Sequence, residues 1–472
     1  MSDPSFERTA WLPDLLYTGT KFESGLALVC DAGGSIAGLT REPEGFEKVV
    51  RLKGRAMLPG LVNAHSHAFQ RVIRGRTERR TRAHDSFWSW RELMYSAAGR
   101  LTPEDIYDAS RMAFMEMALA GITAVGEFHY LHHAPGGAPF EDPNLLAKEV
   151  IRAALDVGLR IALLRVAYAR AGHDAAPDPV QLRFIETRAD AYLENLLGLD
   201  QHLRKHDASS AWAGIALHSV RALPLDYLQE IARFKSGASR SFPVHIHVAE
   251  QPAEVSACLA EHGRTPVGLL ENLGLLDEHL TAVHAIHITR EEAQRMAATG
   301  ARACVCPTTE RNLGDGIFSH AEPFLERGCQ LALGTDSQTQ IDLLEDAREL
   351  ELHLRLERME RAVLAPVEDE SAEALAARLF ACATVGGAMS IGARGGALET
   401  GRPADFFTVD LEDPSIAGAG ADDLLASILF SLERTAIRDV CVGGRRLIED
   451  GRHPSQPEIV ERFKALQKRL WS

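Results

Sequence analysis

The sequence predicts an α/β fold: a (β/α)8 TIM-like barrel joined to a small, discontinuous β-sandwich domain built from both termini. Two observations support this fold. From residue 57 onward, eight short apolar runs alternate with helix-like stretches, the order typical of parallel strands joined by right-handed crossovers. Before that point and after about residue 390, the apolar runs are broken by glycine and proline, as in the edge strands of a small β unit. The predicted units are residues 1–56 for the first part of the β-sandwich, 57–392 for the barrel, and 393–472 for the rest of the β-sandwich with a C-terminal helix.

The eight apolar runs end at Val62, Glu127, Val166, His218, His247, His284, Cys306 and Gly334. The helix-like stretches between them are 102–120, 144–157, 181–196, 290–298 and 341–356. The first begins with Thr102, a good N-cap, and a proline, which is favoured at the first helical position. An open, doubly wound sheet is the alternative, but the Gly-x-Gly-x-x-Gly that it would carry after its first strand is missing. We therefore expect a closed barrel, with its active site at the C-terminal ends of the strands.

Length and composition indicate a soluble globular enzyme: 472 residues, of which 46% are hydrophobic and 25% charged. The net charge of −15 argues against nucleic acid or an anionic membrane as a partner. The first residues do not resemble a signal peptide, and we expect no apolar run near the ~20 residues of a membrane span. Seven cysteines without a Cys-x-x-Cys predict reduced thiols in the cytoplasm, with Cys304 or Cys306 in the core. The charged run 71–82 is expected to be mostly a solvated loop.

The chain is organised around residues 57–69. Their apolar part, 58–62, predicts a short buried strand that leads into His65 and His67. On an extended backbone, residues two apart point to the same face, so these two imidazoles could bind one ion. Taken alone, a His-x-His pair is a weak signal.

Further strand ends carry residues of the same chemistry: His247, Glu250, His284 and Asp336. Zinc binds histidine nitrogen and carboxylate oxygen, and a catalytic zinc site keeps one position for water. The first and last strands of a closed barrel are neighbours, so their distance along the chain is no obstacle. We expect a catalytic metal site at the mouth of the barrel.

The residues alone leave three choices open. His245 and His247 share one face of a strand, and either could be a ligand. His284 and His287 both lie at the end of the sixth strand, and one of them is expected to be a core or supporting histidine. Asp336 could cap the next helix instead of binding a metal.

Four motifs resemble those of the amidohydrolase superfamily. They are Leu-Pro-Gly-Leu-Val-Asn-Ala-His-Ser-His at 58–67, His-Val-Ala-Glu at 247–250, Val-His-Ala at 283–285 and Gly-Thr-Asp-Ser at 334–337. The resemblance covers nearly the whole chain. It implies metal ligands and catalytic residues as follows: ligands His65, His67, His247 and Asp336, and catalytic residues Glu250, His284 and Asp336. In members of this superfamily that hold two metals, a carboxylated lysine on strand four bridges them. Strand four here has no lysine, so the resemblance implies one Zn2+. Fe2+ or another divalent ion also suits this donor set.

Four further segments are similar to the formimidoylglutamate deiminases, iminohydrolases of histidine breakdown: 68–71, 85–95, 127–130 and 306–316. The similarity implies zinc-dependent hydrolysis of N-formimidoyl-L-glutamate to N-formyl-L-glutamate and ammonia. It also implies that the glutamyl part is bound by Gln70, Arg91, Tyr130, His218 and Arg221.

Two arginines suit such a small dicarboxylate, because a planar guanidinium can hold each carboxylate through two hydrogen bonds. Arg91 follows Phe87, Trp88 and Trp90, which we expect to stiffen a loop, and Arg221 follows strand four. Taken singly, either arginine could instead form a surface ion pair. Barrels of this kind often form homodimers.

In the implied mechanism, the metal lowers the pKa of its water towards ~7. Asp336 takes the proton of this water, Glu250 pairs with the iminium nitrogen and relays a proton to it, and His284 orients the nucleophile. Two alternatives remain. One is another mononuclear deaminase that acts on a purine- or pterin-like ring, and the other is a non-catalytic scaffold with the same fold.

Overall fold

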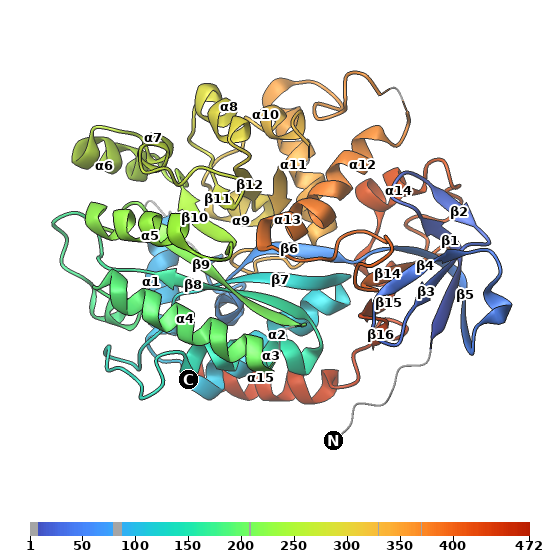
Figure 1. Ribbon diagram of the computed structural model, residues 1–472, viewed down its shortest axis with the longest axis horizontal. Coiled ribbons are helices and arrows are strands. Elements are labelled where there is room, and N and C mark those ends of the chain that lie inside the picture. The colour runs from blue at the N-terminus through green and yellow to red at the C-terminus, as the bar shows by residue number, and fades with distance from the viewer. Residues whose placement is uncertain (1–7, 79–86, 207–208, 329, 370) are drawn as a thin grey trace.

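The structure, a computed structural model, describes residues 8–78, 87–206, 209–328, 330–369 and 371–472. Two sheets organise the chain, and the strands from both termini gather at one end of the molecule (Figure 1). One sheet has eight parallel strands in chain order. They are β6 (Leu61–Ser66), β7 (Ile122–His129), β8 (Arg160–Ala167), β9 (Ala211–Ser219), β10 (Val244–Val248), β11 (Leu280–His284), β12 (Arg302–Val305) and β13 (Leu331–Leu333). The predicted barrel is confirmed.

The barrel closes between its first and last strands. Ser66 and Asp336 form a parallel bridge, in which the Asp336 N–H donates to the His65 carbonyl and the His67 N–H donates to the Asp336 carbonyl, each at 3.0 Å. Gly334 allows this close approach, because a Cβ added there would lie 2.7 Å from the Cβ of His65. Closure therefore brings the ends of β6 and β13 into direct contact.

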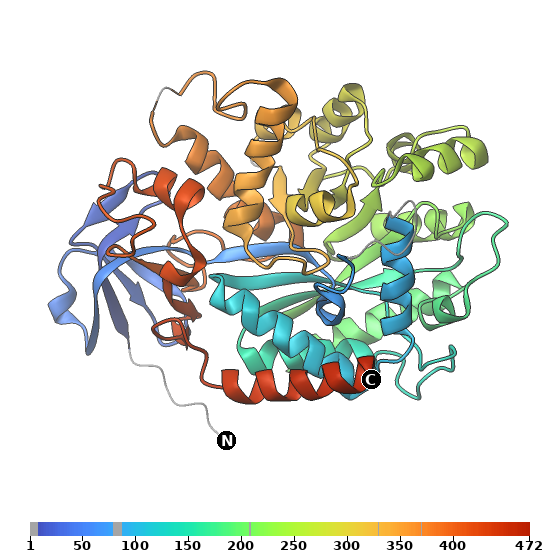
Figure 2. The same cartoon turned by 180° about the vertical axis from the view of Figure 1, so that it is seen from behind.

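Helices connect the strands and cover the outside of the barrel. Those before β10 are η2 (Ala68–Ile73), α1 (Phe87–Ala98), α2 (Pro103–Leu119), α3 (Leu145–Val157), η3 (Pro179–Arg183), α4 (Ala189–His206) and α5 (Leu225–Gly237). Those between β10 and β13 are α6 (Pro252–His262), α7 (Pro266–Asn272), α8 (Arg290–Ala298), α9 (Pro307–Leu313) and α10 (Glu322–Leu325). The later ones are α11 (Leu343–Arg358), α12 (Ala374–Ala381), η4 (Cys382–Gly386), α13 (Gly387–Ile391), α14 (Leu424–Ser431), η5 (Arg434–Ala436) and α15 (Gln456–Trp471), the last of which lies along α2 (Figure 2).

Two local predictions were wrong. The helix expected at 181–196 is a short turn, η3, followed by α4. At the end of η3, the fully buried Arg183 donates to the backbone carbonyls of Ala98 and His133, which fixes the chain in a path that does not continue as a helix. The loop expected before Arg91 is helix α1, which packs apolar side chains such as Met94 against the core.

The other sheet, also of eight strands, confirms the β unit expected from the two termini. Its strands run in the order β16-β15-β14-β5-β1-β3-β4, with β2 beside β1. They are β1 (Thr9–Tyr17), β2 (Phe22–Ser24), β3 (Ala27–Cys30), β4 (Ile36–Thr40), β5 (Lys48–Pro59), β14 (Phe406–Asp410), β15 (Ile437–Val442) and β16 (Arg445–Ile448), with η1 (Pro43–Gly45) between β4 and β5. β14 lies antiparallel to β5, and this sheet has a core of its own, in which the rings of Trp11 and Phe406 meet edge-on at 5.2 Å.

The apolar run 58–62, expected to be one strand, is divided between the two sheets. β5 ends at Pro59 and β6 begins at Leu61. At Gly60, between them, an added Cβ would lie 2.3 Å from the Oγ1 of Thr123, so the turn from one sheet to the other requires glycine. The predicted domain limits stay a prediction.

A continuous helical stretch, 374–391, lies against the base of the barrel. Its 18 residues are long and apolar enough to cross a membrane, contrary to the expectation from sequence, but 67% of the stretch is buried inside the molecule. Gly387 contacts β6, where an added Cβ would lie 2.2 Å from the carbonyl oxygen of Val62. His245 Nε2 donates to the carbonyl of Ser390 at 3.0 Å. These contacts are those of a core helix.

We predict that Gly387→Ala destabilises the fold, because the new methyl group would meet the backbone of β6. Overpacking of this kind costs about 1–3 kcal/mol. The measurement is the melting temperature by calorimetry. Gly198→Ala is the control, since Gly198 is exposed on α4 with nothing within 4 Å of an added Cβ, and it should leave stability unchanged or raise it. A Gly387→Ala protein that melts no lower than wild type would contradict the packing described.

Candidate functional site

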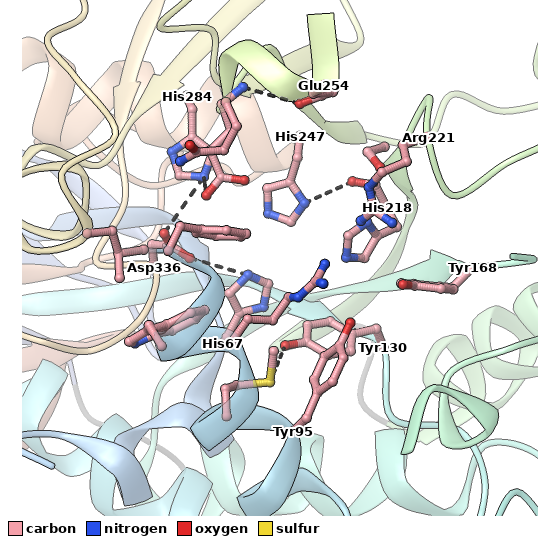
Figure 3. A pocket seen from close by; sticks show the side chains of 18 of the residues that line it. His67, Tyr95, Tyr130, Tyr168, His218, Arg221, His247, Glu254, His284 and Asp336 are labelled. Carbon is pink, nitrogen blue, oxygen red and sulfur yellow. Dashed lines mark hydrogen bonds and ion pairs between the residues drawn. The ribbon is translucent and has the colours of Figure 1, made fainter. Parts of the chain in front are cut away.

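A cavity of about 270 Å3 lies at the C-terminal ends of the barrel strands (Figure 3). All the site residues expected from the sequence line it except His65, which is fully buried behind them. Residues that are far apart in the chain thus meet at one end of the barrel, where enzymes of this architecture carry their active sites.

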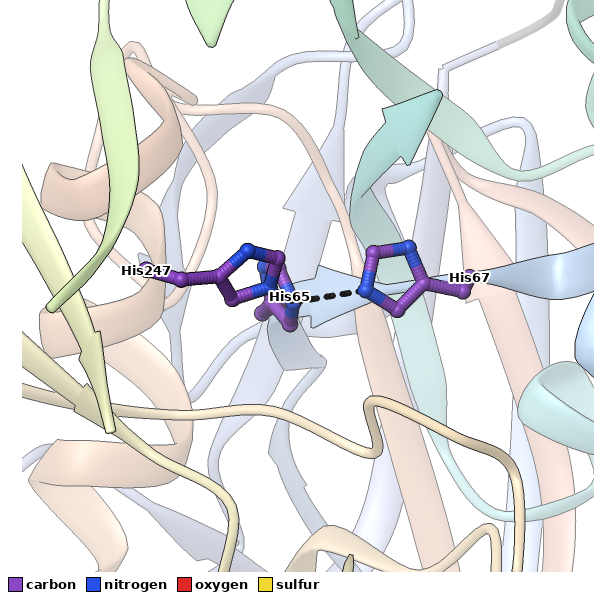
Figure 4. A group of neighbouring side chains, drawn as sticks. All are labelled: His65, His67 and His247. Carbon is purple, nitrogen blue, oxygen red and sulfur yellow. Dashed lines mark hydrogen bonds between the residues drawn. The ribbon is translucent and has the colours of Figure 1, made fainter. Parts of the chain in front are cut away.

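Three imidazoles converge at the floor of the cavity (Figure 4). The Nε2 atom of His65 lies 3.2 Å from that of His67 and 3.2 Å from that of His247. Asp336 Oδ1 lies 3.5 Å from His65 Nε2 and 3.3 Å from His67 Nε2. In a tetrahedral zinc site with bonds of ~2.0–2.1 Å, neighbouring donor atoms are about 3.3 Å apart. The three nitrogens and the carboxylate therefore fit one metal ion.

Backbone carbonyls hold two of these imidazoles in the orientation that a metal needs. His67 Nδ1 donates to the carbonyl of Phe128 and His247 Nδ1 donates to the carbonyl of His218, each at 2.9 Å, so Nε2 carries the lone pair. Burial lowers the pKa of His65 to about 3 and also lowers the pKa values of His67 and His247. All three are therefore neutral, which is the form that binds a metal.

The structure decides the choices that the sequence left open. His245 points to the base of the barrel, where it is bonded to Ser390. His287 Nε2 donates to the carbonyl of Asp315 at 2.9 Å and does not line the cavity. The N-cap of α11 is Asp342, whose side chain accepts from the N–H groups of two residues in the first turn, so Asp336 does not have that task.

Carboxylates surround His284, next to the three imidazoles. Its Nε2 lies 3.8 Å from Glu250 Oε1 and 3.8 Å from Asp336 Oδ2, and its Nδ1 lies 3.1 Å from Glu310 Oε1. Burial alone would lower the pKa of His284, but these carboxylates outweigh it and hold the pKa well above its usual value. For Glu250, burial raises the pKa of the carboxyl group. The group thus combines a cationic imidazole with a carboxyl that favours a proton.

The wall opposite carries polar groups that suit an anionic ligand. Gln70 Nε2 donates to the hydroxyl of Tyr130 at 3.0 Å, and Gln70 Oε1 is buried without a partner among the described residues. Arg221 follows β9 and donates to the carbonyl of Ala171. Among the described residues, no carboxylate lies within 4.0 Å of Arg221, so the surface ion pair considered for it is not formed. Arg91 comes from α1 and lies over the ring of Tyr95 at 5.4 Å.

Two further predictions, for the aromatic residues before Arg91 and for the charged run 71–82, are each corrected in part, and part of each lies outside the described residues. Phe87 and Trp90 stack at 5.9 Å, but on a helix, and the side chain of Trp88 lies outside the described residues. The charged run 71–82 is not a solvated loop at its start, because Arg71 and Arg74 both bind Glu116, at 2.8 and 2.6 Å. Its residues 79–82 lie outside the described part of the chain.

Several residues that line the cavity were not predicted from the sequence. Tyr95, Tyr168 and Phe184 form an aromatic wall, and Glu254 lies beside Glu250, whose N–H it accepts at 3.3 Å. Tyr168 directly follows β8, so the rule that strand ends carry the site could have found it. The others come from helices and connecting segments that carry no such signal.

The profile of the amidohydrolase family matches residues 56–447. A formimidoylglutamate deiminase from Pseudomonas aeruginosa is 40% identical over 411 residues, which cover 87% of this chain and 88% of the relative. Among solved structures, an amidohydrolase from Brucella melitensis has 33% identity and a TM-score of 0.87, covering 99% of this chain and 100% of that one.

A more distant neighbour shares the fold alone. The structure of an adenosine deaminase from Xanthomonas campestris with bound zinc has 21% identity and a TM-score of 0.81, and the match covers 98% of each chain. Family profile, relatives and barrel architecture agree. This chain belongs to the amidohydrolase family.

Proposed function

We propose that this protein hydrolyses N-formimidoyl-L-glutamate to N-formyl-L-glutamate and ammonia, as a formimidoylglutamate deiminase of histidine breakdown. One observation carries the proposal above all: one cavity combines a three-histidine, one-aspartate group with Arg91 and Arg221. A substrate with a cationic amidine and two carboxylates matches this distribution of charge. The identity to a relative of that name supports the same substrate.

In this proposal, His65, His67, His247 and Asp336 hold one divalent ion. Zinc suits these donors and their spacing, although three imidazoles and a carboxylate also accept Fe2+. When bound, such an ion lowers the pKa of a water molecule and polarises the substrate. β9 carries no lysine that could bridge a second ion, which supports a single metal in this shell.

The acid–base steps fall to three side chains. Asp336 accepts the proton that the attacking water loses. Glu250 pairs with the amidine nitrogen and returns a proton to it, so that ammonia leaves. His284, fixed by Glu310 on one side, donates from its other nitrogen to the oxygen added to the amidine carbon.

The glutamyl part is held by the opposite wall. Arg221 with His218 binds one carboxylate, and Arg91 with Tyr130 and Gln70 binds the other. The partnerless Oε1 of Gln70 and the Arg221 guanidinium without an ion pair among the described residues leave polar groups free for a ligand. The expectation of a cytoplasmic homodimer stays a prediction.

A ring deaminase is the second candidate, since the aromatic wall of Tyr95, Tyr168 and Phe184 could stack on a purine or pterin. Against it stand the two guanidinium groups that line the cavity, whose positive charge suits a dicarboxylate better than a neutral ring. A non-catalytic scaffold is less well supported, because all four metal donors are in place.

We predict that the purified enzyme releases ammonia from N-formimidoyl-L-glutamate and not from adenosine, guanine or a pterin. The product should be N-formylglutamate rather than formamide and glutamate. Removal of the metal with a chelator should abolish turnover, and added zinc should restore it. Turnover of a purine with none of the amidine would sink the proposal, and a metal-free protein that gains nothing from zinc would favour the scaffold.

We predict that Arg91→Lys lowers kcat/KM at least ~10-fold, because lysine cannot reproduce the planar two-point grip on a carboxylate. Steady-state kinetics on the amidine substrate measure the change. Arg188→Lys is the control, since this arginine is exposed and pairs only with neighbouring Asp190. Equal kcat/KM values for Arg91→Lys and the control would refute the grip.

We predict that Glu250→Gln keeps its metal yet loses at least ~10²-fold in kcat, the usual scale of general acid–base help. Metal analysis and kinetics on one preparation separate the two effects. Glu261→Gln, at the far end of α6, should retain both properties. Loss of zinc with Glu250 would mean that this carboxylate is a ligand and not the acid.

A further inference from the structure

A second group of metal donors lies beside the first. A ring nitrogen of His284, the Cys306 thiol and a carboxylate oxygen of Glu310 all lie within 4.8 Å of one another. The three residues come from neighbouring barrel strands, at the end of β11, just after β12 and in the first turn of α9. They are 1%, 0% and 2% exposed.

The imidazole of His284 stands between the two groups. Its Nε2 faces the first group, 3.8 Å from Asp336 Oδ2, while its Nδ1 faces Glu310 at 3.1 Å. The first group of metal donors consists of three other imidazoles and Asp336, so it needs neither nitrogen of His284. Nδ1 is therefore available to a second ion.

The donors of this second group suit a soft divalent ion. Nitrogen, thiolate and carboxylate are all zinc ligands. A thiolate and a carboxylate together cancel the charge of a divalent ion, so the buried site is neutral, which avoids the penalty of an unpaired buried charge. The distance of 3.1 Å from His284 Nδ1 to Glu310 Oε1 is close to the spacing of about 3.3 Å between neighbouring donor atoms in a tetrahedral shell.

We propose that His284, Cys306 and Glu310 form a second, inhibitory site for a soft divalent ion such as zinc. On binding, the proton on His284 Nδ1 and the thiol proton of Cys306 leave to solvent, and the ion takes their places. The ion then replaces the contact between His284 Nδ1 and Glu310, which fixes the imidazole in the proposed mechanism. Only this inhibition rests on the function proposed above, because the binding itself does not depend on the substrate.

Cobalt absorption tests the binding directly. A thiolate bound to Co2+ gives an intense charge-transfer band in the near ultraviolet, which histidine and carboxylate ligands do not give. Enzyme that already holds one zinc should develop this band on addition of Co2+ and reach two metals per chain. Cys306→Ala should lack the band, whereas Cys304→Ala should keep it, since Cys304 is equally buried, two residues earlier in β12, but lies outside the group.

Glu310→Gln is the second variant, because it removes the charged ligand while keeping the shape, and it should weaken the band. Absence of a band in the wild type would overturn the proposal. So would a band that survives in Cys306→Ala, or one that disappears in Cys304→Ala alone. In those cases Glu310, which also accepts the Cys306 N–H at 2.8 Å, serves only to orient His284.

Kinetics test the inhibition. Excess zinc should slow the wild type and Cys304→Ala at least ~10²-fold, the scale expected when a group that handles protons is lost. Each rate is compared with that of the same protein holding one zinc. Cys306→Ala should resist, and equal inhibition of all three proteins would refute the proposal. A wild type that shows the cobalt band but no turnover of the amidine would instead contradict the proposed function and leave the second site standing.

Discussion

Closure of the barrel between β6 and β13 is the constraint on which the candidate site depends. The backbone bonds that close it join His65 and His67 to Asp336, so the same short segments carry both the closing bridge and three of the four residues that could hold a metal. Between the two histidines, Ser66 donates to the buried carboxylate of Glu127 at 2.5 Å. Any change that opened this seam would separate the donors, and a metal bound to them would in turn hold the seam closed.

The two sides of the cavity carry side chains of opposite charge. Carboxylates dominate the side near His284, where they favour its cationic form, while guanidinium groups lie on the opposite wall. A ligand with a cationic head and an anionic tail has one orientation in such a field, and the reverse orientation would bring like charges together. Charge separation across one small cavity thus sets the position of the reacting carbon before any chemistry begins.

The donor residues could be predicted because each ends an apolar run, and period-two alternation is a local property of the chain. The choice between His245 and His247 could not, because both point to one face and only the helix at the base of the barrel takes one of them. The boundary at Gly60 also escaped prediction, since one apolar run serves two sheets whose pairing depends on distant strands. Glu310 lies on a helix, so the alternation of side chains in strands could not predict that it belongs to the site.

Strain explains why the scaffold around this site must be rigid. Five of the described residues at the rim of the barrel that are not glycine have positive φ: Ala249, His284, Ala285, Asp336 and Gln338, at 50, 68, 51, 42 and 62°. Such conformations cost of order 1–3 kcal/mol each and persist only where neighbouring bonds determine them. Here Ala285 N–H donates to the Val248 carbonyl at 3.0 Å, and Gln338 Nε2 donates to the Ser66 hydroxyl at 2.8 Å. The packing and hydrogen bonds of the barrel therefore offset the cost of these conformations, which direct His284 and Asp336 to one point. The same rigidity keeps His284 near both groups of candidate metal ligands.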